Sequence, residues 1–531
     1  MTAPSPTVID PTALKEWLHD GSEIALLDVR EYGEFGESHP FYAVSLPYSR
    51  LELDVRRLVP RSTSRVVLYD DGGESDVAVR AASRLGDLGY EALHILRGGL
   101  SAWRAAGLAT FAGVNLPSKT FGELAELAYH TPHISARELA DRVARGDNLV
   151  ILDGRPPAEF AKMSIPGGIC CPNGELALRA ESLAPDPATT IVINCAGRTR
   201  SIIGAQTLIN MGIANPVLAL ENGTQGWFLE GLALERGASR RYADALVTGD
   251  LPRQRANALG LARRYGATII AREQLRGWLS EPSRTTFLCD VRTAEEFARG
   301  SLPGAQHAPG GQLVQATDQY VGVRRARIVV FDGEMVRAPV IASWLVQLGW
   351  DASVLDVDVE TLQTQPASAH INATHSDDPV IASAELATAL TSGARLVDIR
   401  PSSSYRKCHV QGALWSIRPR LRELRIEPGE RVVLIADEAG LAMLAARELR
   451  SVAGPDLAVA VHLEGPAAWA EAGLPTLASA DVPADSECID YLFFVHDRHD
   501  GNRAAALQYL AWETDLVSQI DSRERNEFRL A

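Results

Sequence analysis

The sequence predicts an α/β protein made of four tandem α/β/α sandwich domains, each with a central, mainly parallel sheet, followed by a C-terminal helical tail. The first supporting observation is a phrase that occurs four times in the 531 residues: a short apolar run that ends in Asp, with Arg two residues later. The copies are ALLDVREYGEF, VILDGRPPAEF, FLCDVRTAEEF and RLVDIRPSSSY, which place Asp28, Asp153, Asp290 and Asp398 at the run ends. Each run is short and apolar enough to be a buried strand.

The second observation is the order of elements after this strand. Each copy is followed by a second apolar strand, a loop and a helical stretch, as in IVINCAGRTRSIIGAQTLINMGI. A third strand then turns into another helix, and Trp103, Trp227 and Trp469 occupy the same place in three of these endings. The third unit has no clear copy of this ending. Strands that alternate with helices predict parallel pairing through right-handed crossovers.

The repeat sets the expected domain boundaries. The predicted domains are residues 1–112, 126–236, 262–362 and 374–478, and the tail is 479–531. Linkers are expected at about 112–132, 237–266 and 362–378, where the periodic pattern lapses.

The tail does not repeat. Its YLFFV phrase (491–495) predicts a strand or a packed segment, and HDRHDGN (496–502) predicts a solvated turn in preference to a metal site. Beyond it the chain predicts a helix that docks on a domain or on a second subunit, as in a homodimer. Apolar residues at helical spacing support that helix: Leu507, Leu510, Val517 and Ile520.

Composition disfavours several classes of function. A net charge of −15 argues against a general surface for nucleic acid or anionic membranes, although a local basic pocket stays open. The N-terminus has no secretory pattern and no apolar run is long enough to span a bilayer, so a cytoplasmic protein is expected. The six cysteines are then expected as free thiols. They form no zinc-type pairs, and neither a metal nor a cofactor is expected.

One loop has the pattern of a nucleophilic site. Cys195 lies between an expected strand end and an expected helix start, where free backbone N–H groups and the helix dipole favour a thiolate. Arg198 and Arg200 add positive charge, which favours a thiolate further and attracts an anionic donor. Gly197 lets the loop turn tightly, and Ala196 leaves room over the sulfur. The competing interpretation, a buried structural cysteine, is disfavoured by this loop position and by the two arginines.

The Asp-x-Arg strand ends, the small-residue phrases SIPGG (164–168) and SLPGA (301–305), the CAGRTRS loop and the Trp-containing endings together resemble the rhodanese family. The resemblance covers about residues 5–478. It implies a sulfurtransferase in which Cys195 takes sulfane sulfur from an anionic donor such as thiosulfate. A persulfide on this cysteine then passes the sulfur to a thiol, cyanide or protein thiol with ping-pong kinetics.

The same resemblance assigns roles to neighbouring residues. The loop residues that would contact the donor are Ala196, Gly197, Arg198, Thr199, Arg200 and Ser201. Asp153, Arg155 and Glu159 are interpreted as supporting scaffold.

Two alternatives stay open beside the sulfurtransferase. A Cys-x5-Arg phosphatase on the same fold would need an arginine at position 201, where this chain has Ser201, and it would have His in place of Asn194. The second alternative is a non-enzymatic scaffold or binding protein built from rhodanese-like domains.

The other three units lack the nucleophile. The distance of 17 positions from Cys195 to Gly212 recurs from Asp332 to Gly349, which predicts Asp332 at the cysteine position of the third unit. The same reasoning predicts Asp437 in the fourth unit and either Asp70 or Asp71 in the first. A carboxylate cannot carry a persulfide, but it can accept hydrogen bonds from the same amides.

Overall fold

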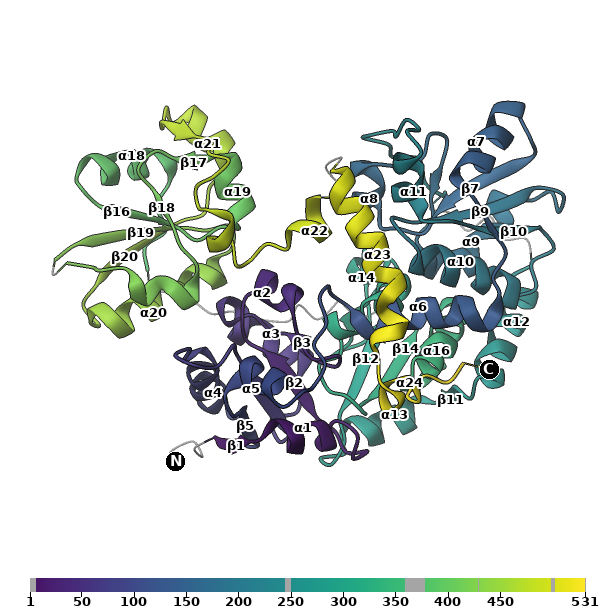
Figure 1. Ribbon diagram of the computed structural model, residues 1–531, viewed down its shortest axis with the longest axis horizontal. Helices are drawn as coiled ribbons and strands as arrows, with labels where there is room; N and C mark the ends of the chain where they lie inside the picture. Colours follow the sequence, from purple (N-terminus) through teal and green to yellow (C-terminus); the bar gives the residue numbers. More distant parts are fainter. Residues whose placement is uncertain (1–5, 244–249, 359–377, 428, 498–501, 531) are drawn as a thin grey trace.

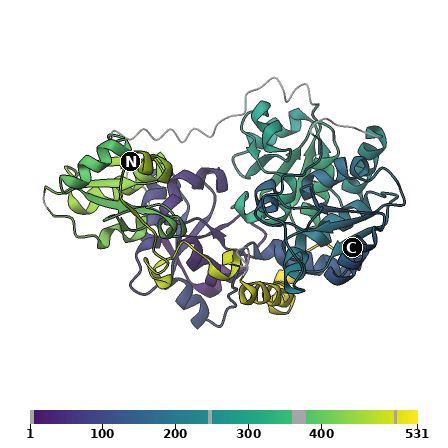
Figure 2. The same cartoon turned by 90° about the horizontal axis from the view of Figure 1, so that it is seen from above.

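The computed structural model describes residues 6–243, 250–358, 378–427, 429–497 and 502–530. These residues form four α/β domains with parallel sheets, followed by C-terminal helices, which confirms the predicted fold class (Figure 1). Seen from above, the first and fourth domains form one half of the molecule, and the second and third domains form the other (Figure 2). The expected linker 362–378 lies outside the described residues except for Asp378.

The first three domains share one sheet topology, in which every strand pair is parallel. The strand orders are β1-β5-β4-β2-β3, β6-β10-β9-β7-β8 and β11-β15-β14-β12-β13. The strands are β1 (Thr7–Ile9), β2 (Ala25–Asp28), β3 (Val44–Ser45), β4 (Val66–Tyr69), β5 (Leu93–Leu96), β6 (His133–Ile134), β7 (Leu149–Asp153), β8 (Ile169–Cys170), β9 (Thr190–Asn194), β10 (Val217–Leu220), β11 (Thr268–Ile270), β12 (Thr286–Asp290), β13 (Gln306–His307), β14 (Arg327–Phe331) and β15 (Asp351–Leu355).

Helices cover both faces of these sheets (Figure 1). In the first domain they are α1 (Pro11–Trp17), α2 (Tyr32–Glu37), α3 (Leu51–Leu58), α4 (Val77–Asp87) and α5 (Gly99–Ala105). In the second they are α7 (Ala136–Arg145), α8 (Pro157–Lys162), α9 (Asn173–Leu183), α10 (Thr199–Asn210) and α11 (Gly223–Leu229). In the third they are α13 (Arg272–Leu279), α14 (Ala294–Arg299), α15 (Gly310–Gln315) and α16 (Arg337–Gln347).

The fourth domain has a smaller version of this sheet, in the order β18-β16-β19-β20. A single parallel bridge from Val380 to Val461 stands where the other domains have their edge strand. Its strands are β16 (Arg395–Asp398), β18 (Leu414–Trp415), β19 (Arg431–Ile435) and β20 (Ala458–His462), with an antiparallel pair of β17 (His409–Val410) and β21 (Thr476–Leu477). Its helices are α18 (Ser383–Thr391), α19 (Ser402–Lys407), α20 (Ala439–Ala453) and α21 (Pro466–Glu471).

Two of the predicted linkers contain helices, which the lapse of the repeated pattern does not indicate. Helix α6 (Leu116–Tyr129) lies within the expected linker 112–132, and α12 (Leu251–Arg264) lies within 237–266. Both pack against helices of the domains, α6 on α10 and α12 on α16. None of the helices in the described ranges is long and apolar enough to cross a membrane.

The repeated Asp-x-Arg phrase forms a buried ion pair in every domain. The closest N–O distances are 2.6–2.7 Å in the pairs Asp28–Arg30, Asp153–Arg155, Asp290–Arg292 and Asp398–Arg400. Each Asp also accepts the backbone N–H of its own Arg, and each Arg donates to a backbone carbonyl eight residues further on. The pair therefore joins the end of a central strand to the loop that follows it.

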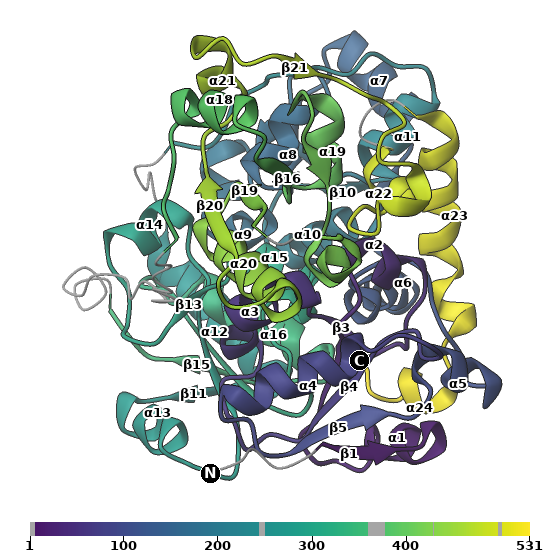
Figure 3. The same cartoon turned by 90° about the vertical axis from the view of Figure 1, so that its left-hand side faces the viewer.

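The tail contacts all four domains, at Ser402 of the fourth, Gly36 of the first, Thr199 of the second and Arg325 of the third. It contains α22 (Phe493–His496), α23 (Arg503–Gln519) and α24 (Ser522–Arg525), and it runs along one side of the molecule (Figure 3). The strand expected as one option for YLFFV is a short helix instead. Helix α23 packs on α6 and α11, and its buried residues are Ala505, Ala506, Tyr509, Glu513 and Leu516.

The predicted apolar positions are covered except at the first of them. Ile520, just beyond the helix, is buried, and Leu510 and Val517 are half-buried, whereas Leu507 is exposed. Docking of this helix on a domain is confirmed.

A buried arginine joins the second and third domains. Arg337, at the start of α16, contacts Glu175 of α9 at 2.9 Å and Glu296 of α14 at 2.7 Å, and also Glu334 at 2.6 Å. The Arg337 side chain is fully buried. Although burial acts in the opposite direction, hydrogen bonding and charge from Arg337 lower the pKa of Glu296 to about 2. Of these contacts, the one with Glu175 joins the two domains, since Glu296 and Glu334 belong to the third domain together with Arg337.

The ion pair between Glu296 and Arg337 should make the stability of the protein depend on pH in the acid range. Because the folded pKa of Glu296 lies below its ordinary value of 4.5, its contribution is complete above pH 4.5 and is lost as pH falls toward about 2. Glu296→Gln should lower the unfolding free energy at pH 7 by about 3 kcal/mol. Thermal unfolding from pH 7 to pH 3 should show the difference from wild type shrinking below pH 4.5. Glu295→Gln, at the exposed neighbouring position, is the control, and an equal effect there would contradict the assignment.

Candidate active site

Cys195 follows β9 directly, and α10 begins four residues later. Its side chain is 2% exposed. Ser201, in the first turn of α10, donates a hydrogen bond from Oγ to the Cys195 Sγ at 3.0 Å. The backbone of the loop is held from the other side, because Thr224 and Gln225 of α11 donate their N–H groups to the carbonyls of Cys195 and Ala196 at 2.8 and 3.0 Å. The sulfur is buried, but it lies at a polar helix start and not in an apolar core.

The scaffold of the loop begins at the neighbouring strand. Asp153 and Asn194 are paired in register across β7 and β9, and the Asn194 side-chain amide donates to Asp153 at 2.6 Å. Arg155 holds the same carboxylate through two further hydrogen bonds, at 2.8 and 2.7 Å. These contacts position the strand end that precedes Cys195.

The third domain reveals what the loop amides can hold. Strand register pairs Asp290 with Phe331 as it pairs Asp153 with Asn194, so Asp332 occupies the position of Cys195. The Asp332 carboxylate accepts backbone N–H groups from Val336, Arg337 and Ala338 at 3.2, 3.0 and 3.3 Å. The corresponding amides in the second domain belong to Thr199, Arg200 and Ser201. This position therefore accommodates a negative charge.

The first domain has the same arrangement. Asp28 pairs with Tyr69 in register, which places Asp70 at the cysteine position and resolves the ambiguity with Asp71. Asp70 accepts N–H groups from Gly72 and Ala78 at 2.9 and 3.0 Å. In both domains the aspartate therefore accepts backbone N–H groups of its loop, as the sequence predicts.

The fourth domain corrects one prediction. Asp398 pairs with Ile435, so Ala436 occupies the cysteine position and Asp437 lies one residue beyond it. The spacing argument failed because α20 extends to Ala453, so that Gly454 stands one position later relative to the strand than Gly212 does.

The two arginines of the loop have different surroundings. Arg200 is buried and donates to both carboxylate oxygens of Glu159, at 2.9 and 2.8 Å. Burial alone would lower the pKa of the Arg200 guanidinium, but Glu159 and the Cys195 sulfur outweigh it and raise that pKa above its usual range. Arg198 instead turns to α6, where it binds Glu123 at 2.8 Å and Glu126. The charge of Arg200 therefore acts on the sulfur, whereas the Arg198 guanidinium is held by α6.

Segments outside the repeat cover the loop. A Cβ at Gly197 would lie 2.8 Å from a carboxylate oxygen of Glu513 and 3.1 Å from the Tyr509 ring, so α23 packs directly on this residue. Thr199 donates to Glu513 at 2.7 Å, and Lys119 of α6 contacts the same carboxylate at 3.0 Å. Thr199 therefore turns its hydroxyl to the tail and away from the predicted donor contact.

Sequence reasoning missed these covering residues. Helices α6 and α23 belong to no repeat, and neither carries a motif that points to a site. Sequence reasoning also missed Gln312 of α15, whose side-chain oxygen lies 3.4 Å from the Arg200 guanidinium. Only the acidic and basic residues at helical spacing in α6, Lys119, Glu123 and Glu126, could have signalled a charged face toward a partner.

Comparison with known proteins adds independent findings. A family model described as rhodanese-like domain matches residues 10–106, 135–230 and 271–363, more than half of the chain. The chain is 41% identical to a thiosulfate sulfurtransferase from Pseudomonas aeruginosa, whose crystal structure aligns with a TM-score of 0.90 over 99% of both chains. It is 37% identical over 109 residues to the uncharacterized protein slr1261 of Synechocystis sp., covering 20% of this chain and 58% of that protein. A rhodanese-related protein from Thermoplasma volcanium shares 25% identity, over 20% of this chain and 97% of its own, with a TM-score of 0.18.

Because α23 covers the Cys195 loop, substitutions on its two faces should change the alkylation rate of Cys195 to different extents. Tyr509→Ala should speed alkylation of Cys195 by iodoacetamide about tenfold, because losing about 1.4 kcal/mol of local packing raises the open population by that factor. Peptide mapping by mass spectrometry measures the rate. Leu507→Ala, on the exposed face of the same helix, should leave the rate unchanged, and equal rates in all three proteins would show that α23 does not limit access.

Proposed function

The chain belongs to the family of proteins with rhodanese-like domains, and from that premise we propose that it is a sulfurtransferase of the EC 2.8.1 class with Cys195 as its sulfur carrier. Thiosulfate is the proposed donor, since the similar protein from Pseudomonas aeruginosa is a thiosulfate sulfurtransferase and aligns over 99% of the chain. A thiol, cyanide or a protein thiol is the proposed acceptor. The second domain is the proposed catalytic unit, because the first, third and fourth carry Asp70, Asp332 and Ala436 at the cysteine position.

The reaction divides into two displacements. The Cys195 thiolate attacks the outer sulfur of thiosulfate, a new S–S bond forms, and the old S–S bond breaks with its electron pair leaving on sulfite. In the second step the acceptor attacks the outer sulfur of the persulfide. The Cys195–sulfur bond then breaks, its electron pair returns to Cys195 as thiolate, and the acceptor leaves as a persulfide or as thiocyanate.

The observation that supports this proposal most directly is the set of hydrogen bonds to the Asp332 carboxylate in the third domain. Three amides at the start of α16 hold that negative charge at 3.0–3.3 Å. The equivalent amides at the start of α10 would stabilise the Cys195 thiolate and the terminal sulfur of its persulfide. Ser201 adds a donor at 3.0 Å, and it is a proposed positioning residue for the sulfur.

Arg200 and Glu159 complete the proposed site. Arg200 supplies positive charge coupled to the sulfur, and Glu159 holds its guanidinium in one orientation through two hydrogen bonds. A bidentate pair of this kind restricts the guanidinium without removing its remaining donors. We assign Arg200 to attraction of the anionic donor, and Arg198 to anchoring α6 over the loop.

A half-reaction tests the carrier directly. Incubation with thiosulfate followed by intact-mass measurement should show one added sulfur atom on the wild-type chain and none on Cys195→Ser. Cys289→Ser is the control, because Cys289 is a fully buried strand residue whose pKa burial raises to about 12. Sulfur uptake by Cys195→Ser at the wild-type level would refute the proposed carrier.

Substitution of Arg200 and substitution of Arg198 should have different effects on kcat/KM for thiosulfate. Arg200→Gln should lower kcat/KM for thiosulfate by about tenfold or more, because a contact to a charged group contributes about 1.5–3 kcal/mol. Arg198→Gln should have a smaller effect on the same parameter, since its guanidinium is bound by Glu123 and Glu126. Initial rates of sulfite release measure both. A larger loss in Arg198→Gln would reverse the assignment of the two residues.

A further inference from the structure

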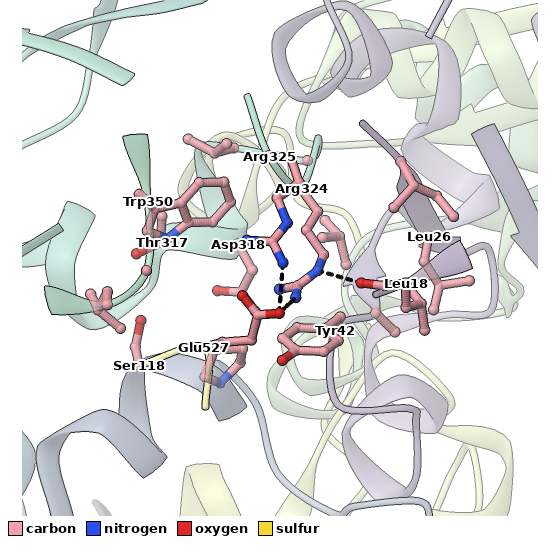
Figure 4. A pocket seen from close by; sticks show the side chains of 18 of the residues that line it. Leu18, Leu26, Tyr42, Ser118, Thr317, Asp318, Arg324, Arg325, Trp350 and Glu527 are labelled. Carbon is pink, nitrogen blue, oxygen red and sulfur yellow. Dashed lines mark hydrogen bonds and ion pairs between the residues drawn. The ribbon is translucent and has the colours of Figure 1, made fainter. Parts of the chain in front are cut away.

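A cavity outside the Cys195 loop lies where the first domain, the third domain, α6 and the end of the tail meet (Figure 4). Its volume is about 70 Å³, which exceeds the space needed for a single water molecule. Most of its wall is apolar. The apolar lining includes Leu18, Ile24, Leu26, Val321, Trp350 and Phe528.

Charged groups gather at one side of this cavity. Arg324 and Arg325 both contact the same carboxylate oxygen of Glu527, at 2.9 and 2.6 Å. The Arg324 guanidinium also lies over the Tyr42 ring, 3.6 Å from its centroid, and donates to the Leu18 carbonyl at 3.0 Å. Figure 4 shows both arginines directed at Glu527, with which they form ion pairs. Two guanidinium groups sharing one carboxylate leave an excess of positive charge.

Two polar atoms at this position have unmet hydrogen-bonding capacity. The Arg325 Nε and the Asp318 Oδ1 are buried and have no hydrogen-bond partner among the described residues. Leaving such atoms unpaired costs free energy, which a ligand would recover. Arg325 also has a left-handed backbone, with φ of 69°, a conformation that a non-glycine residue adopts at a cost and that is enriched at binding sites.

The ionisation of Asp318 indicates the sign of the ligand. Burial raises the pKa of Asp318 to about 7, so near neutral pH its carboxyl is protonated for much of the time and can donate an O–H. Together with the Arg325 Nε–H, it presents hydrogen-bond donors beside an excess of positive charge. A negatively charged acceptor complements this arrangement.

The cavity also borders an open groove that is rich in arginine. The two share Arg325, Gly349 and Trp350 in their linings. Four arginines of the groove are held in ion pairs, Arg61 with Glu23, Arg65 with Asp20, Arg284 with Asp351 and Arg325 with Glu527. Since most of the groove's charge is paired, the excess of positive charge lies in the cavity, where Arg324 and Arg325 share one carboxylate.

We propose that this cavity binds a small organic anion, a carboxylate or sulfonate on a compact apolar body. Its oxygens accept hydrogen bonds from Arg325 and Asp318, and its hydrocarbon contacts Leu18, Leu26 and Phe528. The site is separate from the sulfur-transfer site and does not depend on the proposed sulfurtransferase activity.

Three ligands of closely similar shape test the proposal on the wild-type chain. Isobutyrate, its neutral analogue isobutyramide and the cation isobutylamine are titrated separately, with binding followed by saturation-transfer NMR. Isobutyrate should saturate a single site and bind about tenfold more tightly than isobutyramide, since a charge-assisted contact contributes about 1.5–3 kcal/mol. Isobutylamine should not compete. Preferential binding of isobutylamine, or no saturable binding of isobutyrate, would overturn the proposal.

Variants then locate the site. Arg325→Gly removes the guanidinium and suits the left-handed backbone, and it should weaken isobutyrate binding about tenfold. Asp318→Asn keeps a donor of similar shape without a negative charge, and it should bind isobutyrate at least as tightly as wild type. Arg61→Ala, which removes an arginine that lines the groove and not the cavity, is the matched control and should bind as wild type does. A loss in Arg61→Ala equal to that in Arg325→Gly would place the anion in the groove and overturn the cavity assignment.

Discussion

The backbone amides at the start of the helix after the central strand can donate to the residue that follows the strand, and the chemistry of each loop depends on which residue stands there. In the first and third domains a carboxylate, that of Asp70 or Asp332, accepts these amides. In the fourth domain Ala436 stands at this position and its side chain offers no acceptor. Burial raises the pKa of Asp332 to about 6, yet a carboxyl group in either protonation state has no sulfur to transfer. The second domain places a thiol at the same position, and under the proposed function the same amides would stabilise the Cys195 thiolate and its persulfide.

A second constraint fixes where that loop lies. Each domain buries an Asp–Arg ion pair at the end of the neighbouring strand, and removing either partner would leave a buried charge uncompensated. In the second domain this pair is linked through Asn194 to the residue just before Cys195. The Asp-x-Arg phrase thus recurs in all four domains because each needs the ion pair for its fold. Cys195 stands at the loop position of the second domain alone, because only the proposed chemistry needs a thiol there.

Much of this could be predicted from the sequence, because both constraints are local in the chain. The Asp-x-Arg phrase, the strand–loop–helix order and the position of Asp332 follow from spacing and apolar pattern alone. Asp437 was misplaced because the spacing was measured to a glycine at the far end of a helix, and one extra helical residue shifts that reference. The role of Arg198 could not be predicted, because its partners Glu123 and Glu126 lie in α6, a helix expected as linker. The sequence shows that Arg198 is charged, but only the folded structure shows which carboxylates pair with it.

The first and third domains, which carry aspartate at the cysteine position, provide part of the surface that holds the tail over the Cys195 loop. A Cβ at Gly36 of the first domain would lie 2.3 Å from Leu492, and one at Gly113 would lie 2.1 Å from the Trp512 ring. Gly349 of the third domain meets the backbone of Glu527 in the same way, at 2.5 Å. Side chains at these positions would displace the tail, and with it Tyr509 and Glu513 at the Cys195 loop. Because Cys195 is only 2% exposed, the proposed transfer through this residue requires local opening of the covering segments. Contacts in the first and third domains contribute to the free energy of that opening. Under the proposed function, these domains would therefore influence how readily the second domain exchanges sulfur.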